Sequence, residues 1–326
     1  MSKTKYRHLF AYLAAAILIF AAGWYGNVWC CKNTLRHKIR LIQAKGIHFT
    51  SPLLDIELPE GIDINQEPIP FKRRIESFVQ KQIQNGRVRE ISVYYRDLYD
   101  GPWFQINEHW EFNPASMMKV PVLIAWLKRA ETDNSVLNHT MIYDGAVDMS
   151  ALQDIPPAYT ITPGQSYTIE ELLHYMISYS DNNATALLYN GLNLQELYDV
   201  IDGMDVHNKV KGDSNYVTIH DYSGYFRILY NASFLNRDMS EKALQILSKE
   251  DFQGIASGVP WGVQVASKFG ESGQDVPVRE RQLHEFGIVY HPTRPYILGI
   301  MTIGNNIEQQ KEILRDISKL IYKEID

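Results

Sequence analysis

A serine and a lysine lie three residues apart in the run Ser116-Met117-Met118-Lys119. On a helix, this spacing places the hydroxyl and the amine on one face, one turn apart. A serine hydroxyl is a weak nucleophile at neutral pH and needs a neighbouring base. A lysine can supply that base when burial lowers its pKa. The pair therefore predicts nucleophilic catalysis by Ser116, with Lys119 as the base.

An Asn-Pro-Ala run at 113–115 precedes the serine, so we expect Ser116 at the N-terminus of a helix. The free N–H groups and the dipole of such a terminus favour developing negative charge. The Ser-x-x-Lys spacing has little specificity by itself, because chance supplies it about once in a chain of this length. It also occurs at Ser2 and Lys5.

A second polar motif, Ser180-Asp181-Asn182, is much rarer by chance. An apolar helical stretch precedes it and another follows, so we expect it in a turn between helices. There, a serine hydroxyl can relay a proton to a leaving nitrogen, and an amide side chain can bind a substrate carbonyl. The alternative is a structural cap, because Ser, Asp and Asn are all favoured at helix N-termini.

A third motif, Lys268-Phe269-Gly270, follows a strand-like run at 262–266. A lysine on an edge strand can lower the pKa of neighbouring groups and attract an anionic substrate. A glycine there lets a substrate backbone approach closely. The alternative is an ordinary exposed lysine, which is common on edge strands.

The elements that position these motifs can be predicted from hydrophobic periodicity and capping residues. Helices are expected at 71–84, 117–130, 168–179, 194–201, 218–230 and 308–323, and strands at 91–95, 103–106, 262–266, 286–290 and 296–303. Two strands thus precede the helical stretch and three follow it. This segregation predicts an α+β fold: an antiparallel five-stranded sheet flanked by terminal helices, with an inserted all-helical subdomain.

The order Ser-x-x-Lys, Ser-Asp-Asn, Lys-x-Gly resembles the signature of the serine β-lactamase and penicillin-binding protein superfamily. With Asp at its middle position, the second motif resembles the form found in the class A β-lactamase branch. The resemblance extends from about residue 71 to the C-terminus. It implies a β-lactamase-like fold. It also implies a serine hydrolase that opens β-lactam rings through an acyl-serine intermediate, with a role in antibiotic resistance.

The resemblance implies that Ser116 is the acylated nucleophile and that Lys119 is a base for its activation. Ser180 and Lys268 would shuttle the proton to the leaving nitrogen. No cofactor is implied, and no His, Asp or Glu grouping has the spacing of a metal site.

The resemblance also implies how a substrate binds. Asn182 would hold the amide side chain of the substrate, and the backbone N–H groups of Ser116 and Glu271 would form the oxyanion hole. Gly270 would let the substrate approach the strand.

The chain departs from the class A pattern at the residue that activates the deacylating water. Class A enzymes carry a glutamate on a loop after Ser-Asp-Asn, and no such motif lies in the 35 residues between Asn182 and Thr218. Asp213 is the loop acid that could take this role, and Lys119 could instead serve as the base for both steps. Without a positioned base, the acyl-enzyme would form and persist.

A second departure is Phe269, which stands where the third motif usually carries a hydroxyl that helps to bind the substrate carboxylate. Ser272, Arg281 or His284 could substitute for that hydroxyl.

Two other functions use the same fold. One is a penicillin-binding D,D-peptidase acting on peptidoglycan stem peptides, which the missing loop glutamate favours. The other is a non-catalytic cell-wall binding protein. The intact motif residues count against the non-catalytic binding protein, since a site without catalytic function would lose such costly buried polar groups.

Eight of the 32 basic residues precede Asp55, the first of the 38 acidic residues, so the remainder carries a net charge of about −14. Nucleic-acid binding relies on neutralising phosphates, and such an acidic domain excludes it.

An apolar run of 21 residues at 9–29 carries no charge and is long enough to span a membrane. We therefore expect a cytoplasmic stub and anchor at 1–31, a linker at 32–66 and a catalytic domain at 67–326. The expected protein is a monomer, anchored by one membrane span with its domain outside the cytoplasm. The alternative is a cleaved signal, because Ala21-Ala22-Gly23 is a possible cleavage site.

Overall fold

The computed structural model describes residues 48–51, 69–99, 101–150, 153–204, 206, 209–211, 214–272 and 277–325. The apolar run at 9–29, the two predicted domain boundaries and Asp213 lie outside these ranges. Within the described part of the chain, no helix combines the length and the apolar character needed to cross a membrane.

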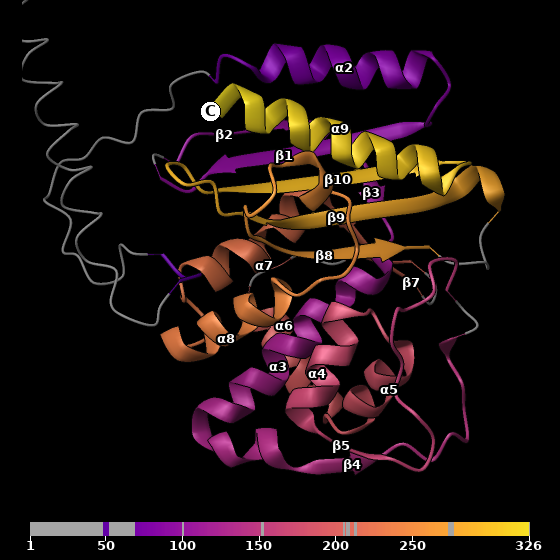
Figure 1. Cartoon of the computed structure of the whole chain (residues 1–326), viewed down its shortest axis with the longest axis vertical. Coiled ribbons are helices and arrows are strands. Elements are labelled where there is room, and N and C mark those ends of the chain that lie inside the picture. Colours follow the sequence, from indigo (N-terminus) through magenta and orange to yellow (C-terminus); the bar gives the residue numbers. More distant parts are fainter. Residues whose placement is uncertain are drawn as a thin grey trace, which may run out of the picture. The chain divides into compact units, whose positions relative to one another are not determined.

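A five-stranded antiparallel sheet forms the centre of the fold (Figure 1). Its strands are β1 (Glu90–Asp97), β2 (Trp103–Ile106), β8 (Val265–Glu271), β9 (Arg281–Val289) and β10 (Tyr296–Gly304). Their order is β2-β1-β10-β9-β8, so the N-terminal pair joins the C-terminal three through β1 and β10. The predicted α+β class, with two early and three late strands, is confirmed.

Two long helices, α2 (Lys72–Gln84) and α9 (Ile307–Ile325), cover one face of the sheet (Figure 1). Each carries apolar residues at helical spacing, and these side chains are buried in one cluster with the strands. Ile75 and Val79 of α2 share that cluster with Ile313 and Ile317 of α9. The sequence therefore placed the terminal helices correctly.

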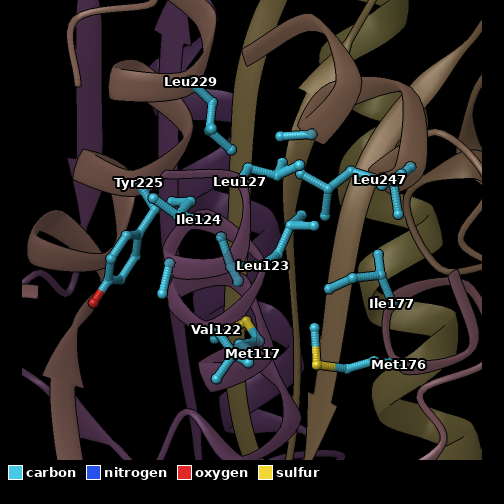
Figure 2. Close-up of a cluster of buried hydrophobic side chains, with 14 of the residues drawn as sticks. Met117, Val122, Leu123, Ile124, Leu127, Met176, Ile177, Tyr225, Leu229 and Leu247 are labelled. Atoms are coloured by element: carbon cyan, nitrogen blue, oxygen red, sulfur yellow. The ribbon is translucent and has the colours of Figure 1, made fainter. Parts of the chain in front are cut away.

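The opposite face carries the helical subdomain. Its helices are η2 (Ala115–Met118), α3 (Lys119–Thr132), α4 (Ile169–Ser178), α5 (Asn182–Asn190), α6 (Leu194–Gly203), α7 (Ile219–Tyr230) and α8 (Arg237–Leu247). Helix α3 is buried along most of its length because neighbouring helices surround it. Figure 2 shows Leu123 and Leu127 of α3 among Ile177 of α4, Leu229 of α7 and Leu247 of α8. Pro121 is tolerated because it lies in the first turn of α3.

Several short elements were not predicted from the sequence. They are β3 (Glu111–Phe112), η3 (Asn134–Asn138), β4 (Thr140–Ile142), β5 (Ser166–Thr168), β6 (Lys209–Lys211), β7 (Ser214–Thr218), η5 (Ala256–Gly258) and η6 (Val278–Glu280). Most are too short for a hydrophobic period to be recognised. Helix α8 was also missed, although its buried Met239, Ala243 and Leu247 have helical spacing.

One predicted strand was misplaced. The sequence placed a strand at 262–266 with the third motif after it, whereas β8 runs from Val265 to Glu271 and contains that motif. The reason is that pairing with β9 sets the strand, with Val265 opposite Val289 and Glu271 opposite Leu283. Gly262, with φ of 91°, lies in the turn before it.

Residues Phe49–Ser51 of the predicted linker pack on the helical subdomain. The Phe49 ring is buried among the core residues and lies 5.1 Å from the Tyr290 ring. The Phe49 N–H donates to Glu241 Oε1 at 2.9 Å, and the Ser51 N–H donates to Tyr230 O at 2.7 Å. This part of the linker is therefore attached to the catalytic domain.

Candidate active site

Ser116 lies in the 3-10 turn η2, directly before α3. Its side chain is half-buried and lines a pocket of about 720 Å³. Ala115 has a φ of 48°, a left-handed conformation that costs a non-glycine residue about 1 kcal/mol or more. Its N–H donates to Asn113 Oδ1 at 2.9 Å. Ser116 thus follows a strained residue and lies at the start of the helical segment, as predicted.

Two side chains of β9 hold the turn before the serine. The Asn113 N–H donates to Gln282 Oε1 at 3.0 Å, and His284 Nε2 donates to Asn113 O at 3.1 Å. The Thr302 N–H donates to His284 Nδ1 at 3.1 Å, so the ring is neutral. Burial lowers the pKa of His284 to about 3. His284 therefore positions the turn and is unsuited to binding a carboxylate.

Lys119 is buried between α3 and the Ser-Asp-Asn turn, and is 4% exposed. Its Nζ donates to Ser180 O at 2.6 Å and to Asn182 Oδ1 at 2.8 Å, and lies 3.0 Å from Ser180 Oγ. Burial, and then the nearby charge of Lys268, hold the pKa of Lys119 well below its usual range. The lowered pKa favours the neutral amine, which is the form that can accept a proton. The structure thus brings together Lys119, Ser180 and Asn182 of the predicted residues.

The Ser-Asp-Asn motif forms the turn between α4 and α5, as predicted. Ser180 has a φ of 55°, which turns the chain sharply. Asp181 is the N-cap of α5, and its Oδ1 accepts the Asn183 N–H at 2.8 Å. Its Oδ2 accepts the Ile161 N–H at 2.8 Å. The capping role thus belongs to Asp181, while Ser180 and Asn182 contact Lys119.

Lys268 lies on the edge strand β8 and is fully buried. Its Nζ is 2.5 Å from Glu250 Oε2, and the Glu250 side chain is 2% exposed. Burial lowers the pKa of Lys268 and raises that of Glu250, while their contact favours the charged pair. None of the hydrogen bonds between described residues joins Lys268 to Ser180. The sequence did not predict Glu250, because no motif marks an acid that meets the lysine only through tertiary packing.

Gly270 lets β8 pack against η2, the turn that carries Ser116. A Cβ atom at this position would lie 2.4 Å from Pro114 O and 3.0 Å from the Met117 N. The backbone of β8 is therefore in direct contact with η2, an approach that an oxyanion hole shared by Ser116 and Glu271 requires. The Glu271 side chain is buried, and its Oε1 accepts the Ile155 N–H at 2.8 Å.

Phe269 and the side chains that could replace the missing hydroxyl all make other contacts. The Phe269 ring stacks on Phe252, with centroids 4.4 Å apart, in the cluster beneath α2 and α9. Ser272 Oγ accepts the Gln282 N–H at 2.9 Å. Arg281 Nε lies 3.6 Å from Asp154 Oδ2.

The segment after α5 consists of α6 and the β6–β7 hairpin. Asp202 of α6 and Asn215 of β7 line the same pocket as Ser116. Among the described residues that line this pocket, Asp202 carries the one carboxylate. No sequence motif marked Asp202 as a site residue.

A family model described as the Beta-lactamase enzyme family matches residues 70–325. The chain belongs to the beta-lactamase enzyme family. This member is a serine β-lactamase-like hydrolase, which confirms the resemblance read from the three motifs.

Solved structures share the fold of this β-lactamase family member. A mutant of PBP-A, in an acyl-enzyme complex with penicillin-G, is 20% identical with a TM-score of 0.64, over 77% of this chain and 94% of that one. A β-lactamase from Sphaerobacter thermophilus is 20% identical (TM-score 0.65, 78% and 97%). TLA-3 extended-spectrum β-lactamase is 14% identical (TM-score 0.68, 78% and 98%). No curated protein matches the chain.

Proposed function

We propose that this enzyme is acylated at Ser116 by β-lactams, with Lys119 as the base. The observation that carries the proposal is the buried Lys119 amine, whose pKa is lowered and which lines the same pocket as Ser116. This amine also lies 3.0 Å from Ser180 Oγ. A general base is more efficient when its pKa lies closer to the working pH, and burial shifts the pKa of Lys119 in that direction.

The proposed reaction has one proton path. Lys119 takes the proton of Ser116 as its Oγ attacks the acyl carbon, and the N–H groups of Ser116 and Glu271 hold the oxyanion. As the C–N bond breaks, the Ser180 hydroxyl gives its proton to the leaving nitrogen and receives one from Lys119. Lys268, paired with Glu250, then acts through its charge, which adds to the effect of burial in lowering the pKa of Lys119.

The test combines a chromogenic β-lactam with intact mass spectrometry. The wild type is expected to gain the mass of the opened β-lactam on Ser116, and Ser116→Ala is expected to gain none. A wild type that stays unmodified across several β-lactams and pH values contradicts the proposal.

A D,D-peptidase that cleaves peptidoglycan stem peptides is the second candidate. It is favoured by the absence, among the described residues between α5 and α7, of a glutamate on a loop. The similarity to PBP-A is compatible with it. A trapped acyl-enzyme with negligible β-lactam turnover, together with release of D-alanine from a stem peptide, would establish this function.

We also propose that the chain is a monomer held by a single membrane span at 9–29, with its catalytic domain outside the cytoplasm. The length of the uncharged run supports the span. Cell-wall substrates are found on that side of the membrane. Protease added to intact spheroplasts should digest the domain, and full protection until lysis would contradict the orientation.

A further inference from the structure

The pocket that holds Ser116 is much larger than the chemistry at the serine requires. Its volume of about 720 Å³ lies within the range of pockets that enclose small-molecule ligands, about 300–1,000 Å³. The single water that deacylation needs takes only about 30 Å³. Besides Ser116, Lys119 and Asn182, the pocket is lined by side chains that have no part in the proposed proton path. It therefore has room for a further part of the substrate.

Helix α5 carries the pocket away from the serine. Asn182, Thr185 and Tyr189 all line it, and their spacing of three and four residues places them on one face of the helix. Seven residues of helix separate Asn182 from Tyr189 by about 10 Å along the axis. Asn182 Nδ2 donates to Met149 O at 3.4 Å, and an amide nitrogen carries a second hydrogen that can bind a substrate carbonyl. The lined face thus begins at a donor for the substrate and continues for about two turns.

Helix α6 supplies an apolar surface to the same pocket. Leu197 and Ile201 are one turn apart on this helix, and Tyr198 lies between them. Together with Tyr189, they form the α5–α6 wall, which consists of Tyr189, Leu197, Tyr198 and Ile201. Tyr189 and Tyr198 are 41% and 55% exposed, although each lines a pocket. Exposed apolar surface that is gathered in one place marks a binding site, because a ligand that covers it removes it from water.

The charges that line the pocket limit which groups fit there. Among the described lining residues, Asp202 carries the one carboxylate, and it is exposed on α6. Lys119 carries the one amine, and its Nζ already donates to Ser180 O and to Asn182 Oδ1. A negatively charged group beside the α5–α6 wall would therefore meet a like charge, whereas a neutral or positively charged group would not.

We propose that the α5–α6 wall is a subsite for the acyl side chain of the substrate, and that it selects large apolar acyl groups without a negative charge. The proposal rests on acylation at Ser116 and names the substrate class of that same site. The substrates are amides whose acyl portion carries an aromatic or aliphatic group, with Asn182 holding the amide that joins this group to the reacting carbonyl.

The first test compares penicillins that differ only in the acyl group. The acetyl and phenylacetyl derivatives of 6-aminopenicillanic acid are incubated with the wild type. Intact mass spectrometry gives the second-order rate constant for acylation of Ser116 by each. The phenylacetyl derivative should react about 10-fold faster or more, because its ring is removed from water against the wall. Equal rates, or a faster acetyl derivative, overturn the proposal.

Matched variants locate the effect of the acyl group. Tyr189→Ser and Tyr198→Ser each remove a partly exposed ring from the wall, so the ratio of the phenylacetyl rate to the acetyl rate should fall towards one. A ratio of two substrates cancels any general loss of activity in a variant. Trp261→Ser is the control, because Trp261 is fully exposed in the turn before β8 and does not line the pocket; its ratio should equal that of the wild type. An unchanged ratio in both tyrosine variants excludes the subsite.

A second pair of penicillins tests the charge preference. Both carry a phenylacetyl group, with either an aminomethyl or a carboxymethyl substituent at the far end of the ring. The aminomethyl compound should acylate Ser116 about 5-fold faster or more, because it avoids the like charge of Asp202. Asp202→Asn should bring this ratio close to one. Asp199→Asn, which changes an exposed acid of the same helix outside the pocket, should leave it unchanged. A ratio that Asp202→Asn does not alter overturns the charge preference.

A binding measurement separates this inference from the proposed function. If none of the penicillins acylates Ser116, the proposed function fails. Calorimetry with Ser116→Ala then still reports on the subsite. Tighter binding of the phenylacetyl than of the acetyl derivative, lost in Tyr198→Ser on the same background, supports the subsite. Equal or reversed affinities overturn it.

Discussion

At the scale of residues, burial shifts the pKa values of two neighbours on β9, Glu285 and His284, in opposite directions. Burial raises the pKa of Glu285 to about 8, although the carboxylate accepts the Ile255 N–H and the Ser267 hydroxyl. Burial lowers the pKa of His284 to about 3. Both side chains are therefore neutral in the folded protein near pH 6.5. In the unfolded chain Glu285 ionises near pH 4.5 and His284 near 6.5.

The raised pKa of Glu285 predicts that the contribution of this residue to stability falls as pH rises. Its contribution is fully present below pH 4.5 and is lost as pH rises towards 8, because the unfolded chain releases the proton first. Between about pH 6.5 and 8, we expect the contribution of Glu285 to the free energy of unfolding to fall by about 1.4 kcal/mol per pH unit at most. Urea unfolding of the wild type and Glu285→Gln over this range checks it. Equal slopes in the two proteins would contradict the assignment.

The lowered pKa of His284 affects stability at lower pH. Its contribution is present above pH 6.5 and is lost as pH falls towards 3, so it opposes Glu285 in acid. The other groups with shifted pKa values, such as Lys119 and Lys268, are common to the wild type and Glu285→Gln, so the difference between the two proteins above pH 6.5 isolates Glu285.

Lys119 carries the second prediction at this scale. Lys119→Met removes the proposed base, so acylation should slow by about 100- to 10,000-fold while the fold is kept. Lys128→Met on the same helix is the control, because Lys128 is half-exposed and donates to Phe234 O, away from the pocket. Mass spectrometry follows acylation and circular dichroism follows folding. A folded Lys119→Met that acylates normally would show that another group is the base.

At the scale of elements, the contact between β8 and η2 decides the shape of the site. Gly270→Ala should force the strand away from the nucleophile turn, because its Cβ would meet backbone atoms at 2.4 and 3.0 Å. Overpacking of this kind costs about 1–3 kcal/mol. We expect a lower melting temperature and an acylation rate reduced about 10-fold or more, since an oxyanion-hole donor is displaced. Gly304→Ala on β10 is the control, because its Cβ would meet only side-chain atoms, at 3.3 Å or more. Normal acylation by Gly270→Ala would argue against this oxyanion hole.

The segment from α6 to β7 bears on deacylation. Hydrolysis of an acyl-serine needs a base within reach of water, and no loop glutamate is found among the described residues there. We expect a burst of about one product per enzyme before a slow steady state, measured by stopped flow. Asp213→Asn should change the steady-state rate more than the burst. Asp202→Asn tests in the same way whether Asp202, which lines the pocket of Ser116, is the base for deacylation. Rapid linear turnover without a burst would contradict slow deacylation.

At the scale of the whole molecule, the segment before the catalytic domain contributes to its stability. Phe49 is 7% exposed and packs on Tyr290, far along the chain. Phe49→Ala should lower the free energy of unfolding by about 3 kcal/mol, because it leaves a cavity in the core. Equilibrium denaturation measures this. Phe78→Ala, which changes a partly buried ring on α2, should cost less; equal losses would show that Phe49 is not a core residue.

The sequence by itself determined the fold class and the three motifs. The terminal helices and the central strands carry strong hydrophobic periods, and the capping box at Thr168 marks the start of α4. These are local signals, in which each residue type has a physical preference that does not depend on distant partners. The spacing of Ser116 and Lys119 is local in the same sense, so the pair could be recognised before the fold was known.

Only the tertiary structure decided which charges meet. Glu250 reaches Lys268 because the chain after α8 packs against β8, and nothing in either neighbourhood signals this. The bounds of β8 were likewise set by pairing with β9. The neutral state of His284 and the contact of Glu271 with the Ile155 N–H likewise depend on segments far apart in the chain. Burial and pairing depend on the environment that distant segments create, and a sequence pattern reports only its own neighbourhood.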